Sequence, residues 1–244
     1  MKISSRDFYR EMRAVLGPAL KSAGFKPLKG GMAGWQRPAA GGPLCFWFWC
    51  DKWGWGPVWG SCFNLDFSLG AEPGVRTPGT RSERLGFLVE GYPDLEELRQ
   101  INNGVIAGLP GTREGRLQLG RLRGGSEYVI QGFRAEPAPF KIGFDYWLNY
   151  YSIEDVRLWA DYFDRKLPRL IALFENDERS ELGQGRQRFN RVMGAVQALP
   201  AEERAAKIAL FEDYQRAEPS AYWREAAAYW IGEIRDKAAT GARA

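Results

Sequence analysis

The alternation of apolar and polar residues is clearest over residues 59–69, where it predicts a strand with two unlike faces. One face carries the large apolar side chains Trp59, Phe63, Leu65, Phe67 and Leu69. The other, called here the second face, carries Cys62, Asn64, Asp66 and Ser68. Residues 45–50 are aromatic and favour a strand, and residues 51–57 supply Gly, Pro and Asp for a turn. Residues 44–69 are therefore predicted to form a tryptophan-rich antiparallel strand pair.

Helical spacing of apolar residues predicts a first helix over residues 5–23 and a long one that begins after Ser152. Asp94 is predicted to cap another helix with Glu97 as its partner, and three more are expected near 189–198, 201–216 and 220–237. Pro18 and Pro168 predict kinks or a break in their helices. Residues 25–43 read as loop with a short strand around 35–37, and residues 70–93 as a long, partly irregular connection.

Further strands are predicted in two places, as a short pair within residues 117–133 and as one alternating strand over residues 140–151. After residue 176 no strand pattern recurs. The expected class is therefore α+β, with an antiparallel sheet packed against helices and a C-terminal all-helical extension. The corresponding domain prediction is an α+β domain over residues 1–176 and a helical extension over 177–244 that packs on it.

In the strand over residues 45–50, aromatic side chains occupy both the odd-numbered and the even-numbered positions, so both of its faces are aromatic. Either Trp47 and Trp49 or Phe46 and Phe48 therefore share the second face with Asn64 and Asp66. If strand 140–151 joins the same sheet, its apolar residues turn to the core. Asp145, Trp147 and Asn149 then lie on the second face. The expected surface is both aromatic and acidic.

Two explanations are open for such a face. The C-terminal helices cover it, with Trp223 and Trp230 filling the gap, or it is a groove that receives a ligand or a basic partner segment. On the second explanation, the candidate binding residues are Trp47, Trp49, Trp53, Trp55, Asn64, Asp66, Asp145, Trp147 and Asn149.

Charge and composition narrow the choice of partner. The chain has 34 basic and 30 acidic residues, a net charge of +4 that is too mild for a dedicated nucleic-acid binder. A weaker alternative places phosphate contacts at Arg113, Arg116, Arg121 and Arg123. Neither a signal peptide nor a membrane span is expected, and a cytoplasmic location follows.

The sequence contains no histidine, which removes His-activated nucleophiles and His-bound metals together. Cys45, Cys50 and Cys62 are too few for a zinc site and are expected to pack as small apolar residues. We therefore expect no metal and no cofactor. The alternative to a non-enzymatic function is a carboxylate-based, metal-assisted hydrolase or phosphotransfer enzyme. In that enzyme Asp66 and Asp145 would bind a hard cation.

Several short motifs together resemble the bacterial family catalogued as domain of unknown function 4304. They are Ala-Gly-Phe-Lys at 23–26, Trp-Gln-Arg at 35–37, Asp-Lys-Trp-Gly at 51–54, Asn-Leu at 64–65 and the strand-to-helix passage at 151–156. The resemblance covers roughly residues 1–175 and supplies no catalytic residues. It implies a small binding protein, and some members look similar to immunity proteins that neutralise a neighbouring toxin.

The sequence has no recognisable catalytic motif and is rich in aromatic residues, and both features favour a non-enzymatic binding protein. The leading hypothesis is a protein-binding module of immunity or adaptor type that uses the second face against a protein partner, such as a toxin.

Overall fold

The computed structural model describes residues 2–52, 54–73, 75, 79–114, 117–119, 128–130 and 147–241. These residues form two compact units, and in the described part of the chain the boundary falls between Glu178 and Arg179. The first unit combines a sheet with helices and the second is helical, which confirms the α+β class with a C-terminal all-helical part.

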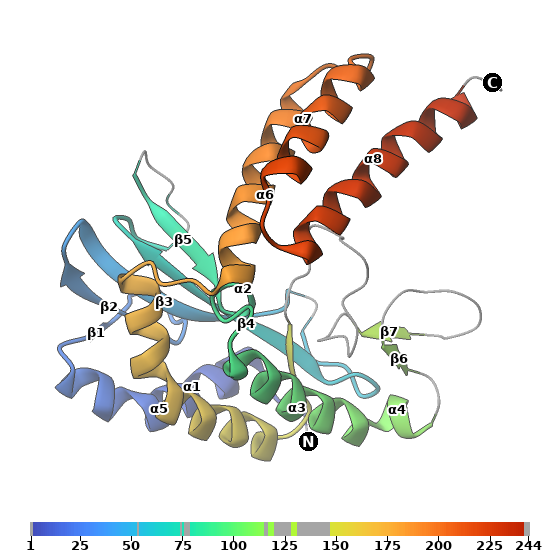
Figure 1. The fold of residues 1–244 in the computed structure, drawn as a ribbon. Helices are drawn as coiled ribbons and strands as arrows, with labels where there is room; N and C mark the ends of the chain where they lie inside the picture. Colours follow the sequence, from blue (N-terminus) through green and yellow to red (C-terminus); the bar gives the residue numbers. More distant parts are fainter. Residues whose placement is uncertain are drawn as a thin grey trace. The chain divides into compact units, whose positions relative to one another are not determined.

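The sheet of the first unit is built around the predicted strand pair (Figure 1). Its order is β1 (Lys26–Pro27), β2 (Gly34–Ala39), β3 (Gly42–Cys50), β4 (Ser61–Leu69) and β5 (Arg81–Arg84), all antiparallel. A sixth strand, β8 (Leu148–Tyr150), pairs with residues 61–63 of β4. The antiparallel pair predicted over residues 44–69 is thus confirmed.

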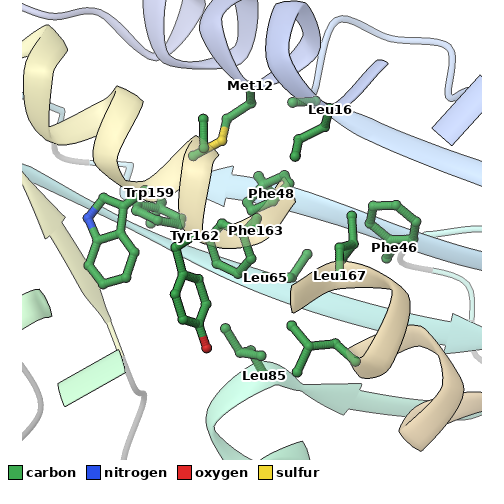
Figure 2. Close-up of a cluster of buried hydrophobic side chains, with 14 of the residues drawn as sticks. Met12, Leu16, Phe46, Phe48, Leu65, Leu85, Trp159, Tyr162, Phe163 and Leu167 are labelled. Atoms are coloured by element: carbon green, nitrogen blue, oxygen red, sulfur yellow. The ribbon is translucent and has the colours of Figure 1, made fainter. Parts of the chain in front are cut away.

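One face of the sheet forms the main hydrophobic core. Phe46 and Phe48 of β3 lie opposite Phe67 and Leu65 of β4, and all four side chains are fully buried. Helices α1 (Ser5–Ser22), α3 (Pro93–Gly108) and α5 (Ile153–Glu175) lie on this side of the sheet (Figure 1). Figure 2 shows the resulting cluster, in which side chains of α1 and α5 meet the strand aromatics.

Helices α1 and α5 of the first unit begin at capping boxes. In α5 the Ser152 Oγ accepts from the backbone N–H of Asp155, and the Asp155 carboxylate accepts from the backbone N–H of Ser152, which confirms the predicted start. Ser4 and Asp7 do the same for α1. Both helices continue through their internal prolines, Pro18 and Pro168, so the break considered at Pro168 does not occur.

The start of α3 corrects the prediction at Asp94. Tyr92 is the N-cap, Pro93 occupies the first helical position, and no side chain caps the helix. Asp94 lies inside the first turn and is buried, with its oxygens 3.3 Å from Lys166 Nζ and 3.2 Å from Arg169 Nε. Its carboxylate therefore joins α3 to α5 instead of capping α3.

Residues 70–93 contain strand β5 and the helical turn α2 (Leu85–Leu88), and the short helix α4 (Pro110–Arg113) follows α3. The two short strands predicted within 117–133 are present as β6 (Leu117–Leu119) and β7 (Tyr128–Ile130), but they pair in parallel and form no hairpin. Of the strand predicted over residues 140–151, the last part is β8. Residues 140–146 lie outside the described residues.

The second unit contains helices α6 (Glu181–Ala198), α7 (Arg204–Ala217) and α8 (Ala221–Gly241), in the regions predicted to be helical. Phe189 lies at the centre of its core, with ring centroids of Tyr214 and Trp223 at 5.6 and 5.2 Å. Glu218 receives two hydrogen bonds from Arg188, at 2.8 and 2.7 Å. Trp223 and Trp230 both belong to this cluster, so they have a structural role within their own unit.

Candidate functional site

The strand register decides which rings of β3 lie on the second face. Trp47 is opposite Asp66, and Trp49 is opposite Asn64. Directly opposed residues of antiparallel strands project to the same side of a sheet. Trp47 and Trp49 therefore share the second face with the polar residues of β4, while the phenylalanines of β3 enter the core.

The carboxylate of Asp66 organises the centre of this face. Its Oδ2 accepts a 2.9 Å hydrogen bond from the indole Nε1–H of Trp49, and its Oδ1 lies 3.1 Å from Arg84 Nε. The guanidinium carbon of Arg84 is 5.1 Å from the Trp49 ring centroid, within the range of a cation–π interaction. Asp66 and Arg84 are each 20% exposed, so this small network is partly shielded from water.

Trp147, the residue immediately before strand β8, adds a third tryptophan to the second face. Trp147 packs edge-on against Trp49 with ring centroids 4.7 Å apart and an interplanar angle of 70°. Asn149, opposite Cys62, is also on this side of the sheet but is buried.

Asn149 is held by α3. Its backbone N–H donates to Asn102 Oδ1 at 2.6 Å, and Asn102 Nδ2 donates to the Trp147 carbonyl at 3.2 Å. The side chain of Asn102 thus pairs with the outer edge of β8 as another strand would. The position of Trp147 follows from this pairing.

Trp47 and Asn64 make no side-chain hydrogen bond within the described residues. A glycine stands opposite Trp47, and a Cβ added at Gly34 would come within 2.8 Å of the Cβ of Trp47. Asn64 is 1% exposed, and neither polar atom of its side chain has a hydrogen-bond partner among the described residues. A buried amide without partners is costly, and both polar atoms of the Asn64 side chain are shielded from solvent.

Three of the predicted site residues are not placed on this face. Trp55 packs against the main core, and its Nε1–H donates to the Tyr151 carbonyl at 2.9 Å. Trp53 and Asp145 lie outside the described residues. The second face as described thus brings together Trp47, Trp49, Asn64, Asp66, Trp147 and Asn149 from the prediction.

Arg84 is the site residue that the sequence-based reasoning missed. It belongs to β5, where Asp66 and Arg84 are opposed in the register. The segment Arg81–Arg84 has no apolar alternation that would identify it as a strand. The only available signal is the need of Asp66 for a basic partner.

The geometry at Asp66 bears on the metal-assisted alternative. Both oxygens of Asp66 already receive donors, so a cation there would have to displace the Arg84 guanidinium. Among the described residues no group of three or more Cys, Asp or Glu side chains could hold a metal ion. Asp145, the other ligand of that hypothesis, is outside the described residues.

The cysteines around the sheet are suited to packing. Burial raises the pKa of the Cys50 thiol to about 11 and also raises the pKa of Cys45 and Cys62. Cys50 lies on the core face, where the Tyr150 hydroxyl is 3.7 Å from its sulfur. A thiol with a raised pKa is a weak nucleophile at neutral pH.

The arginine cluster considered for phosphate binding is described at one position. Arg113 is exposed at the end of α4, and Arg116, Arg121 and Arg123 lie outside the described residues.

Among the helices of the described chain, none combines the length and apolar content that crossing a bilayer requires. Comparison with protein-family models, with curated proteins and with solved structures found no match to this chain.

Proposed function

We propose that this protein is a non-enzymatic protein-binding module whose contact surface is the second face. The observation that carries the proposal is the gathering of Trp47, Trp49 and Trp147 on one side of the sheet. Each of the three is partly exposed, while α1, α3 and α5 occupy the opposite side (Figure 1). The resemblance to the family named above supports the narrower proposal of an immunity or adaptor protein, with a toxin as the candidate partner.

The residue types support an interface. Tryptophan and arginine are enriched among the residues that contribute most to protein–protein affinity, and such residues cluster near the centre of the interface, where binding removes them from water. The second face combines three tryptophans with Arg84 around a single carboxylate. Its charges are balanced internally by the Asp66–Arg84 pair, so apolar contact is expected to contribute more than net charge.

The geometry also reduces the entropic cost of association. Trp49 and Arg84 are both held by Asp66, and Trp147 is held against Trp49. Side chains that are ordered before binding lose less rotamer freedom when the partner arrives. Trp47 forms no hydrogen bond or ring contact within the described chain and can adapt to a partner.

A comparative pull-down tests the proposal. The tagged full chain and its Trp47→Ser variant are incubated with native cell extract, and the recovered proteins are quantified by mass spectrometry. We expect a near-stoichiometric protein with the wild type and at least a tenfold lower recovery with Trp47→Ser. The matched control is Leu158→Ser, which removes a 45% exposed apolar side chain on the outer surface of α5.

Circular dichroism confirms that each variant is folded before the comparison. Equal recovery of the partner by wild type, Trp47→Ser and Leu158→Ser would overturn the assignment of the contact to the second face. Recovery of no stoichiometric partner by the folded wild type would overturn the binding function itself.

A further inference from the structure

A cavity of about 240 Å³ lies in the first unit, between α1, α5 and β2. Its walls are apolar and come mainly from the two helices, with Leu16 and Leu20 of α1 facing Leu167 and Ile171 of α5. Leu16, Phe163 and Leu167 all line the cavity, and Figure 2 shows them among the side chains of the core cluster. The cavity is separate from the second face, because these helices lie on the core side of the sheet (Figure 1).

The size of the cavity suits a small apolar group. An apolar cavity of about 150 Å³ in a protein core binds benzene. The volume of about 240 Å³ therefore has room for a larger group, such as an alkyl chain of about eight carbons or a substituted ring.

The basic residue at the rim is already engaged. Arg37 donates to Glu175 at 2.6 Å, and its guanidinium carbon lies 5.1 Å from the Phe25 ring centroid. An anionic ligand would have to compete with the Glu175 carboxylate for this group.

Asp164 is the polar group at the rim that remains available. It is exposed, lines the cavity, and its carboxylate makes no hydrogen bond or ion pair within the described chain. Its backbone carbonyl also lacks the usual helical donor, because residue 168 is a proline without an N–H. Asp164 and Pro168 both line the cavity.

The charges at the rim favour a cation. Among the residues that line the cavity, Arg37 and Asp164 carry charge, and Arg37 is paired with Glu175, which leaves the negative charge of Asp164. The neighbouring basic side chains of α5 are directed elsewhere, since Arg165 and Lys166 both pair with Glu97 of α3.

We propose that this cavity binds a hydrophobic amine, whose alkyl or arylalkyl group fills the space between α1 and α5 and whose ammonium group contacts Asp164. The apolar walls provide most of the affinity. The partly hydrated contact with Asp164 selects amine over acid.

The test compares three ligands of one length, n-octylamine, n-octanol and octanoate, by isothermal titration calorimetry with the full chain at pH 7. We expect the amine to bind most tightly, the alcohol about threefold to fivefold more weakly, and the acid weakest. This ratio corresponds to a partly exposed ion pair. Failure of all three to bind at millimolar concentration, or tighter binding of octanoate than of octylamine, would overturn the proposal.

Two variants with matched controls separate the apolar and polar contributions. Ala19 is exposed on α1 and lines the cavity, so Ala19→Phe is expected to fill it and to lower octylamine affinity more than tenfold. Ala14→Phe places the same ring on an exposed position of α1 outside the cavity and should change nothing.

Asp164→Asn is expected to reduce octylamine affinity about threefold to fivefold and to leave octanol affinity unchanged. Asp161→Asn, an exposed change one turn earlier in α5, should affect neither ligand. Equal losses for amine and alcohol in Asp164→Asn would show that the carboxylate does not contact the ammonium group and would sink the proposed selectivity.

Discussion

The two faces of strands β3 and β4 are made by the same backbone but have different physical character. On the core face, Phe46, Phe48 and Phe63 are fully buried and make only apolar contacts with helices and other strands. On the second face, Trp47 and Trp49 remain partly exposed and lie among polar groups that need hydrogen-bond partners. The comparison separates aromatic residues that stabilise the fold from aromatic residues that are available for contact.

The largest expected effect comes from removing a ring on the core face. Phe63 packs against Phe8, Trp159 and Phe163, with centroid distances of 4.6, 5.7 and 6.2 Å. Phe63→Ala should lower the free energy of unfolding by about 3–5 kcal/mol, because it leaves a cavity in a closely packed cluster.

Trp47→Ala provides the matching change on the second face. We expect a loss of about 1–2 kcal/mol, because the ring is only partly buried. Urea denaturation of both variants measures the difference. Similar losses of unfolding free energy in Phe63→Ala and Trp47→Ala would contradict the distinction between the two faces.

The next effect concerns the hydrogen bonds of the second face. Asp66→Ala leaves the Trp49 indole N–H and the Arg84 guanidinium without their shared acceptor. The expected loss in unfolding free energy is about 1–3 kcal/mol, since partly buried donors lose their partner. Asp66→Asn keeps an acceptor oxygen and should lose less. An Asp66→Ala variant as stable as the wild type would show that the network does not organise this face.

The last effect is a dependence of stability on pH that originates on the core face. The pKa of Cys50 is raised by burial to about 11, from an ordinary value of 9.0. The unfolded chain therefore releases the Cys50 proton at lower pH than the folded chain. The contribution of the protonated thiol to folding stability is complete below about pH 9 and is lost as the pH rises toward 11.

Urea denaturation between pH 8 and 11 should therefore show falling stability, with a shallower fall in Cys50→Ala. At pH 8 the alkylation of Cys50 by iodoacetamide should be about a hundredfold slower in the folded protein than in urea, given the two-unit difference in pKa. Equal alkylation rates would contradict a buried, protonated thiol on the core face.

Local patterns predicted the parts of the fold whose signals lie within one segment. The alternation in residues 59–69 separates the two faces of β4, and the Ser152–Asp155 pattern locates the start of α5. Strand β3 carries aromatic side chains on both faces, so the sequence does not show which of them enter the core. The register decides this, because it places Phe48 opposite Leu65.

The predictions that failed depended on distant residues. Asp94 and Glu97 match a capping box, but the Asp94 carboxylate is used by Lys166 and Arg169, which lie far along the sequence. The Pro93 position was a local indication of the true helix start, because proline is favoured at the first helical residue. Arg84 was missed for the same reason, as only the pairing of β5 with β4 brings it to Asp66.

The outer strands of the sheet resist addition of another chain. An aromatic sheet with open edges is prone to edge-to-edge aggregation. Here β1 has two residues and contains Pro27, and β5 has four residues, three of them charged. The free side of β8 is occupied by the Asn102 amide, which takes the place that a seventh strand would need. The sheet can therefore present three tryptophans on one face without offering its backbone as a template for aggregation.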